Sequence, residues 1–516
     1  MKALYYRYLF ENVENGMIQA GSIYNEENDC SVNYVYLSGN PTNSNINDGV
    51  SSTDSSRTND VTGIGILDKR TIRRLAGAPI DLVVVGEYTR DCLGILYALL
   101  QNTTIQTVIM PYVAPIHRML VEQWISGEQD MEEEALPEQW ILEPEVSPEK
   151  RLEFSCLIRH PYHALKNMGV ENVYLLYGNC PPCSLDAVQN ARKGNYFELA
   201  DAEDLETIKI MEREYIPVVK AGCIIENKWV FYFSAYGMNV MELYQFTRRY
   251  YTKEGYDRAL RHPENTQYQA GMQRLLEAYK KTYGLEAFAA VIMYAGPGQV
   301  KESGSKINGA MYEQSFGREN HCSPYLDAGR TVCMLKCIQR NDYGMLRNQF
   351  TRESRTLRMG VLFLGNIDMH KNMEEILKRY RGYGKTVRIV SIPGNEDVSK
   401  WNPEFPWKFE GEGIRYWVGN INERMDTKIL KDILLAGSYN RIISVNEEYG
   451  YCLSGYMLDG KNISSFCRRP QKQREKWKKM RRKHGVVLFS NGMFLFIIER
   501  KRKRGYKNGS FHEFGV

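Results

Sequence analysis

Side chains that could do chemistry gather in one short stretch, residues 86–92, with the sequence GEYTRDC. Glu87 and Asp91 supply two carboxylates there, and a third, Asp368, follows another apolar segment much later in the chain. His370 lies two residues beyond Asp368. Such an oxygen-rich set suits Mg²⁺ or Mn²⁺ better than zinc, because hard cations prefer carboxylate oxygens. These residue types make Glu87 and Asp91 candidate catalytic residues, and Asp91 a candidate metal ligand.

A structural role for the same carboxylates is the competing interpretation. Asp91 stands directly before Leu93–Leu100, whose apolar residues have helical spacing, and Asp is a common residue at the N-cap of a helix. We expect Asp91 to cap that helix and Arg90 to pair with Glu87 or Asp368. This interpretation is the favoured one. It predicts no bound metal and leaves no residue that we would firmly name as catalytic.

A strand and a helix frame the stretch. The β-branched apolar run at residues 82–85 predicts a buried strand, and Leu93–Leu100 predicts the helix that follows. Thr107–Met110 predicts a second buried strand that stops at Pro111. In α/β folds, chemistry usually sits on a loop at the carboxyl end of such a strand. The pattern therefore predicts that residues 86–92 form a loop of that kind.

The remaining segments predict a mixed α/β protein. The first two strands, Ala3–Leu9 and Ser31–Leu37, are joined by a polar, turn-rich link, and a hairpin is predicted for Val218–Ile225 with Lys228–Ser234. Further strands are predicted at Val173–Tyr177, Phe288–Tyr294, Thr331–Ile338, Gly360–Leu364, Val387–Ile392 and Arg441–Val445, and further helices at Ile116–Ile125, Val240–Tyr251, Gln267–Tyr283, Met373–Tyr380 and Ile429–Leu435. Strands come first rather than alternating with helices, which favours a two-layer sheet sandwich over a dinucleotide-binding sheet.

Length, composition and charge set the limits. The chain has 516 residues, of which 43% are hydrophobic and 25% are charged, and its net charge is +5. These values are typical of a globular protein with a large core. No apolar run approaches the ~18 residues of a membrane span, so none is expected. The 11 cysteines form no framework, and the N-terminus has no signal peptide pattern, which together predict a cytoplasmic protein.

The order of these segments resembles the metallo-β-lactamase fold, in particular its competence-protein-like branch. In that family a buried strand ends in a T-H-x-H-x-D-H loop, and the matching stretch here is VVVGEYTRDCLGIL. Glu87 stands at the first His and Thr89 at the second. Asp91 stands at the Asp and Cys92 at the last His. Of the ligands that the family uses, this loop keeps only Asp91.

Later segments match the family in order but not in ligands. The family's Gly-Asp, whose carboxylate bridges two metals, is matched by Gly365-Asn366 in GVLFLGNIDM. The branch's P-H-H-G-S segment is matched by Pro393, Gly394 and Asn395, without a histidine. The segment RIISVNEEYGYCLSGYM resembles the closing strand without its His-Pro. The likeness spans about residues 1–460 and rests on motif order.

The resemblance implies an αββα sandwich of two mixed sheets flanked by helices. A dinuclear zinc site needs four or five histidines with two carboxylates, and every matched histidine is replaced here. The resemblance therefore implies a catalytically inactive protein, a pseudoenzyme, that acts as a binding or scaffolding component with a protein partner. Relatives of this architecture include DNA-uptake proteins and modules of bacterial multi-gene systems such as phage defence. A phosphodiesterase or nuclease that uses Mg²⁺ or Mn²⁺ is the alternative. The resemblance then implies Glu87, Asp91 and Asp368 as its candidate catalytic residues and Asp91, Asp368 and His370 as its candidate metal ligands.

A basic C-terminal segment offers a third function, nucleic-acid binding. Its density of positive charge could neutralise several phosphates, and Trp477 could stack on a base. An acidic protein partner or a solvated surface would use the same charges. The candidate binding residues are Arg468, Arg469, Lys472, Arg474, Lys476, Trp477, Lys478, Lys479, Arg481, Arg482, Lys483, Lys501, Arg502, Lys503 and Arg504.

These patterns predict two regions. Residues 1–465 are expected to form one domain, with a disordered loop near 39–60, where Asn, Ser, Thr and Asp dominate, and a helical insertion near 236–285. Residues 466–516 are expected to form the basic extension.

Overall fold

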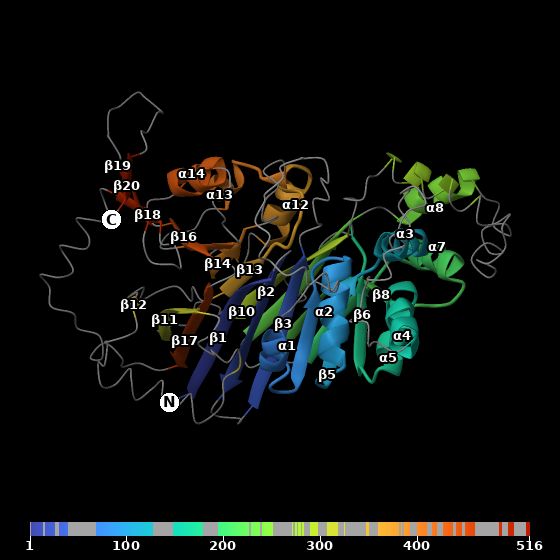
Figure 1. The fold of residues 1–516 in the computed structure, drawn as a ribbon, viewed down its shortest axis with the longest axis horizontal. Helices are drawn as coiled ribbons and strands as arrows, with labels where there is room; N and C mark the ends of the chain where they lie inside the picture. Colours follow the sequence, from blue (N-terminus) through green and yellow to red (C-terminus); the bar gives the residue numbers. More distant parts are fainter. Residues whose placement is uncertain are drawn as a thin grey trace, which may run out of the picture.

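Figure 1 shows the computed structural model of the chain. It describes residues 2–13, 16–25, 30–39, 69–126, 148–178, 194–226, 229–237, 240–250, 271, 274–275, 277–279, 281–282, 289–297, 307–317, 325, 347–349, 360–380, 383, 386–392, 400–409, 415–419, 427–436, 440–445, 449–459, 484–487, 494–499 and 512–515.

The described residues contain both strands and helices. The strands are β1 (Lys2–Val13), β2 (Gly16–Asn25), β3 (Cys30–Gly39), β4 (Ile80–Val85), β5 (Ile105–Pro111), β6 (Asn172–Leu176), β7 (Gly194–Leu199), β8 (Val218–Glu226), β9 (Trp229–Tyr236), β10 (Ala290–Pro297), β11 (Ile307–Gly317), β12 (Arg347–Gln349), β13 (Gly360–Phe363), β14 (Val387–Ser391), β15 (Arg415–Gly419), β16 (Asn440–Ser444), β17 (Tyr449–Asp459), β18 (His484–Val487), β19 (Phe494–Glu499) and β20 (His512–Gly515). The helices are α1 (Lys69–Leu75), α2 (Arg90–Leu100), α3 (Pro115–Ser126), α4 (Pro148–Arg159), α5 (Pro161–Asn167), α7 (Ala202–Glu212), α8 (Val240–Tyr250), α12 (Met369–Tyr380), α13 (Phe405–Lys408) and α14 (Thr427–Ala436).

One mixed sheet contains all the strands from β1 to β17. Its pairings run from β12 through β11, β17, β1, β2, β3, β4, β5 and β6 to β8. They continue from β8 through β9, β10, β13, β14 and β15 to β16, and β7 also pairs with β8. The strands from β3 to β6 are parallel, as are those from β13 to β16. Strands β18, β19 and β20 form a separate small sheet.

The predicted αββα sandwich of two separate sheets is wrong. Strand β8 pairs with β6 and β9, and β9 pairs with β10, so one hydrogen-bonded sheet continues from the first half of the chain into the second. This sheet folds back on itself into a nearly closed barrel. The Val291 N–H donates to the Gly86 carbonyl at 2.7 Å and thereby joins β10 to the end of β4. Sequence patterns identify strands from neighbouring residues, whereas these pairings depend on contacts far apart in the chain.

Aromatic side chains fill the interior of the barrel. Tyr36 on β3 stacks on Phe363 on β13, with ring centroids 5.0 Å apart. Tyr34 meets Phe231 edge-on at 5.4 Å. Such aromatic pairs contribute about 0.5–1.5 kcal/mol each beyond the burial of their area. The packing fixes β3, β9 and β13 relative to one another and therefore positions the loops at their ends.

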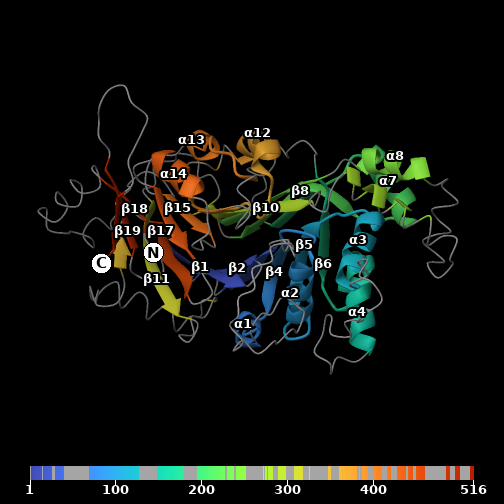
Figure 2. The ribbon, with the colours of Figure 1, turned by 45° about the horizontal axis from the view of Figure 1, so that its top comes forward.

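The helices lie outside the sheet (Figures 1 and 2). Helix α2 packs against β3 and β4, and α5 packs against β6. Helices α12, α13 and α14 cover the part of the sheet that contains β13–β16 (Figure 2). Among the described helices, none combines the length and the apolar character needed to cross a membrane.

Many local predictions are confirmed. Strands β6, β14 and β16 occur where the sequence predicts strands, and β8 and β9 form the predicted hairpin. The prediction of a polar link between the first two strands is wrong, because residues 16–25 form β2, which pairs with β1 and β3. Gly21 interrupts the apolar pattern of this strand, but the fold needs glycine at that position. A Cβ at Gly21 would lie 2.0 Å from the Arg7 carbonyl oxygen on the neighbouring strand β1. Outside the described residues lie the predicted strand Thr331–Ile338, the predicted loop beyond Gly39 and most of Gln267–Tyr283.

Candidate functional site

The loop after β4 lies between β3 and β10. The Gly86 N–H donates to the Leu37 carbonyl at 2.7 Å, and the Gly86 carbonyl accepts from the Val291 N–H at 2.7 Å. A Cβ at Gly86 would lie 2.7 Å from the Leu37 carbonyl oxygen and from Tyr36 Oη. This close approach requires glycine. Two backbone hydrogen bonds therefore hold the start of the predicted chemical loop.

Glu87 joins the ends of two strands that lie far apart in the sequence. Its Oε1 accepts a hydrogen bond from the Asn366 N–H at 2.6 Å, and the residue is only 3% exposed. Asn366 follows Gly365, whose φ of +59° makes the turn at the end of β13. The bond therefore connects the carboxyl end of β4 with that of β13.

Two further polar groups adjoin this bond. The Tyr36 hydroxyl donates to the Val291 carbonyl at 2.7 Å. Burial raises the pKa of Tyr36, and the nearby Glu87 carboxylate raises that pKa further, so the phenol stays protonated. Lys400, which is 8% exposed, places its Nζ 3.5 Å from Asn366 Oδ1. The result is a buried junction that contains a carboxylate, a neutral phenol and an amine.

Asp91 is not the N-cap of its helix. Helix α2 begins at Arg90, and Thr89 is the N-cap, with its Oγ1 accepting from the Cys92 N–H at 3.4 Å. The Thr89 carbonyl accepts from the Leu93 N–H at 3.0 Å. Thr is also a preferred N-cap residue, so a choice between Thr89 and Asp91 could not be made from residue type. The side chains of Arg90 and Asp91 lie outside the described part of the chain, and their metal-binding and pairing roles stay predictions.

Asp368 does cap a helix. Its Oδ1 accepts from the His370 N–H at 2.9 Å and from the Lys371 N–H at 3.3 Å, at the start of α12. Its Oδ2 lies 3.1 Å from Lys371 Nζ. His370 is exposed on the first turn of the same helix. The carboxylate of Asp368 is therefore used in holding the end of α12.

The predicted site residues are only partly brought together. Glu87 binds the Asn366 backbone amide. Asp368 caps α12, and His370 is exposed on the first turn of that helix. Across the described ranges, no three His, Cys, Asp or Glu side chains form a group that could hold a metal ion. The basic candidates from Arg468 to Lys483 and from Lys501 to Arg504 lie outside the described residues, so the structure does not place them.

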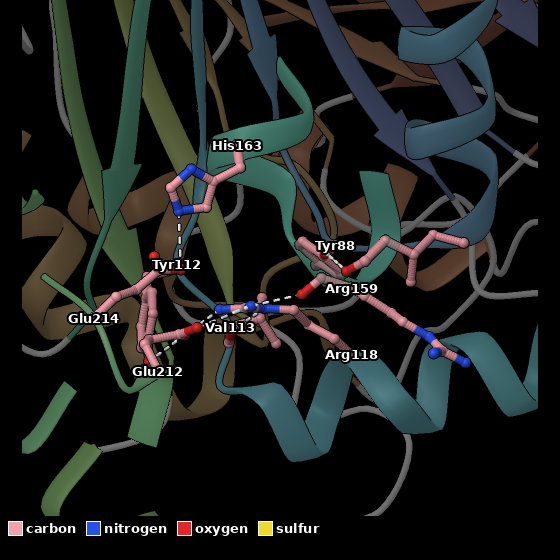
Figure 3. A network of polar contacts seen from close by, with 9 residues as sticks. Tyr88, Tyr112, Val113, Arg118, Arg159, His163, Glu212 and Glu214 are labelled. Atoms are coloured by element: carbon pink, nitrogen blue, oxygen red, sulfur yellow. Dashed lines mark hydrogen bonds and ion pairs between the residues drawn. The ribbon is translucent and has the colours of Figure 1, made fainter. Parts of the chain in front are cut away.

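A second polar cluster, which the sequence did not predict, surrounds Arg118 on α3 (Figure 3). Arg118 and Glu212 have side chains that are 2% and 4% exposed, and they form a buried ion pair. Arg118 Nε donates to the Val113 carbonyl at 2.7 Å, and Nη1 donates to the Arg159 carbonyl at 2.8 Å. The Tyr112 hydroxyl donates to Glu212 Oε1 at 2.9 Å. The cluster ties the segment after β5 to the ends of α4 and α7.

The positive charge of Arg118 is balanced inside the cluster by the carboxylate of Glu212. Burial lowers the pKa of Arg118, but the Glu212 carboxylate more than offsets this, so the pKa lies above its usual range. The neighbouring His117 is also buried, and burial lowers its pKa to about 3, so its ring is neutral. The sequence could indicate this cluster only through Arg118, a charged residue within an apolar helix pattern. Its partner Glu212 lies 94 positions later, so local patterns do not connect the two.

No protein-family model matches the chain, and no curated protein gives a significant match. The geometry of the two clusters is therefore the evidence that bears on function. In both clusters, charged side chains are bound to backbone groups or to each other, which is the pattern of structural junctions.

Proposed function

We propose that the protein is a binding or scaffolding component whose loop after β4 serves as a structural junction rather than a catalytic centre. The bond between Glu87 and Asn366 carries the proposal. A catalytic carboxylate must be reachable by a substrate or a metal ion. Glu87 is 3% exposed, and its Oε1 is directed to a backbone amide at 2.6 Å. Asp368, the other described carboxylate of the candidate set, is used as a helix cap.

The proposal includes a protein partner and a reducing compartment in which the two proteins bind each other. The described cysteines Cys92, Cys156, Cys223 and Cys452 are free thiols, which supports a cytoplasmic location. The resemblance to the metallo-β-lactamase family, and a part in DNA handling or phage defence, rest on sequence motifs alone. Nucleic-acid binding by the basic extension is a separate prediction and is compatible with scaffolding.

An assay of phosphodiester hydrolysis tests the proposal. Purified full chain is incubated with bis(p-nitrophenyl) phosphate and Mn²⁺ or Mg²⁺, and the release of p-nitrophenol is followed. We expect p-nitrophenol to be released no faster than by the metal ion without the protein. The variants Glu87→Gln, Asp91→Ala and Asp368→Asn should give the same rate.

The metal-dependent phosphodiesterase is the outcome that would replace the proposal. It predicts a rate clearly above that of the metal ion, with a loss of about 100-fold or more in Asp91→Ala. Because Glu374 is 75% exposed, pairs with Lys408 and is not one of the candidate residues, Glu374→Gln serves as a matched control. If the catalytic site exists, the Glu374→Gln variant should hydrolyse the substrate at the wild-type rate.

A further inference from the structure

Arg388 is a buried cation, and two of its three guanidinium nitrogens have no hydrogen-bond partner. It is the second residue of β14 and is 1% exposed. Neither its Nε nor its Nη2 has a hydrogen-bond partner. Among the described residues, no carboxylate forms an ion pair with it. A buried charge is costly unless it is paired and hydrogen-bonded, so Arg388 requires an explanation.

The two unused donors belong to one edge of the guanidinium group. The N–H bonds of Nε and Nη2 point in parallel from that edge, with a spacing that matches two oxygens of a carboxylate or phosphate. Buried arginines elsewhere in the chain show a different state. Arg379 has a side chain that is 1% exposed, and its Nε donates to Glu375 Oε1 at 2.8 Å. Arg388 therefore presents a complete bidentate donor edge that Arg379 does not have.

A second arginine lies close to the same ring. The Cζ of Arg388 lies 5.3 Å from the centroid of Tyr416, and the Cζ of Arg441 lies 5.7 Å from that centroid. Tyr416 on β15 is the register partner of Arg441 on β16 and of Ile389 on β14. An aromatic face stabilises a cation but cannot accept hydrogen bonds in the guanidinium plane. Two positive charges thus lie near one ring, and Arg441 is the more exposed of the two arginines.

This pair lies at the opposite end of the strands from the Glu87 junction. β13 and β14 are parallel, and Gly360 at the start of β13 pairs with Val387 at the start of β14. Asn366 follows the carboxyl end of β13, whereas Arg388 stands at the amino end of β14. Figure 1 shows β13, β14 and β16 in one part of the sheet. The arginine pair is therefore distinct from the candidate site described above.

We propose that Arg388 and Arg441 form a binding site for a small oxyanion of the phosphate type. Two of its oxygens accept hydrogen bonds from Nε and Nη2 of Arg388, and Arg441 contributes a second positive charge beside the Tyr416 ring. The burial of Arg388 selects a compact anion rather than a nucleic-acid backbone. This site is independent of the scaffolding role and adds a ligand to it.

Thermal unfolding of the full chain tests this site. Wild type is compared in sodium phosphate and in sodium chloride at the same ionic strength and pH. Phosphate at about 100 times its Kd should raise the unfolding midpoint by about 2–5 °C. Arg388→Met should abolish that shift, and in chloride its midpoint should exceed that of wild type, because an unpaired buried charge has been removed. Isothermal titration with phosphate should show binding to wild type only.

Arg379→Met is the matched control, since Arg379 is also buried beside an aromatic ring, 4.8 Å from the Tyr236 centroid. It should lower the midpoint in both salts but retain the phosphate shift. If Arg388→Met does not fold, Arg388→Lys decides, because a lysine retains the charge without the bidentate edge and should bind phosphate at least ~10-fold more weakly. Equal midpoints of wild type in phosphate and chloride would overturn the site, as would a phosphate shift that persists in the Arg388 variants.

Discussion

Glu87 Oε1 accepts a hydrogen bond from the Asn366 backbone N–H at 2.6 Å, although the two residues lie 279 positions apart in the sequence. The bond connects the loop that follows β4 with the turn that follows β13. These are the two places where the sequence predicts metal-binding carboxylates. A carboxylate that holds a backbone amide in this way contributes to the stability of the fold, and this has measurable consequences.

Removal of the Glu87 carboxylate should destabilise the protein. Glu87→Ala leaves the Asn366 N–H without its acceptor, and we expect the free energy of unfolding to fall by about 2–3 kcal/mol. Glu87→Gln retains an acceptor oxygen and should cost about 1 kcal/mol. Urea titration followed by tryptophan fluorescence measures both values. If Glu87→Ala were as stable as wild type or more stable, the carboxylate would be a strained functional group, as catalytic residues often are.

The buried pair of Arg118 and Glu212 should behave as one unit. Either single change, Arg118→Met or Glu212→Leu, leaves an unpaired buried charge and should cost about 3–5 kcal/mol. The double variant should cost clearly less than the sum, because neither charge remains. Lys209→Ala, which removes an exposed partner of Glu206 at 3.6 Å, is the control and should cost under about 1 kcal/mol. Additive losses in the double variant would show that the pair is not coupled.

His117 should make the protein less stable as the pH falls. Burial lowers the pKa of His117 in the folded state to about 3, whereas the unfolded chain has the ordinary value near 6.5. Between these two values only the unfolded state binds the proton, so stability is lost as pH falls below about 6.5. From pH 7 to pH 5 the expected loss from this group is about 2 kcal/mol.

The variant His117→Gln isolates that contribution. It removes the titrating ring, so its unfolding free energy should change by about 2 kcal/mol less than that of wild type over the same pH range. Urea titrations at pH 5, 6 and 7 provide the comparison. Parallel pH profiles of the two proteins would exclude a neutral His117 as the source of acid sensitivity.

Nucleic-acid binding by residues 468–504 should depend strongly on salt. If these residues neutralise six or more phosphates, affinity should fall by about 10³-fold or more between 50 and 200 mM salt. Fluorescence anisotropy with a labelled oligonucleotide measures this fall. A variant with Lys478, Lys479, Arg481 and Arg482 changed to Gln should bind more weakly and show a shallower salt dependence. Binding that is absent, or insensitive to salt, would leave an acidic protein partner or a solvated surface as the role of this segment.

Local features of the fold follow from the sequence. The apolar runs of β4 and β5 and the helical spacing of α2 are set by near neighbours, and the structure contains those elements at those positions. Capping was less predictable, because Thr89 and Asp91 are both suitable N-cap residues and the choice depends on where the turn begins. The strand β2 was missed, because Gln19 and Gly21 interrupt its apolar pattern while β1 and β3 on either side stabilise it.

Apolar runs and helical spacing predict many of the strands and helices, including β4, β5 and α2, but they do not predict β2. The folded protein is needed to show that the strands join into a single sheet, that Glu87 binds the Asn366 amide, and that Arg118 pairs with Glu212. The difference lies in the range of the interactions. Periodicity and turn preferences are encoded among residues a few positions apart, whereas strand pairing and buried charge pairs form between residues that meet only after the chain has folded.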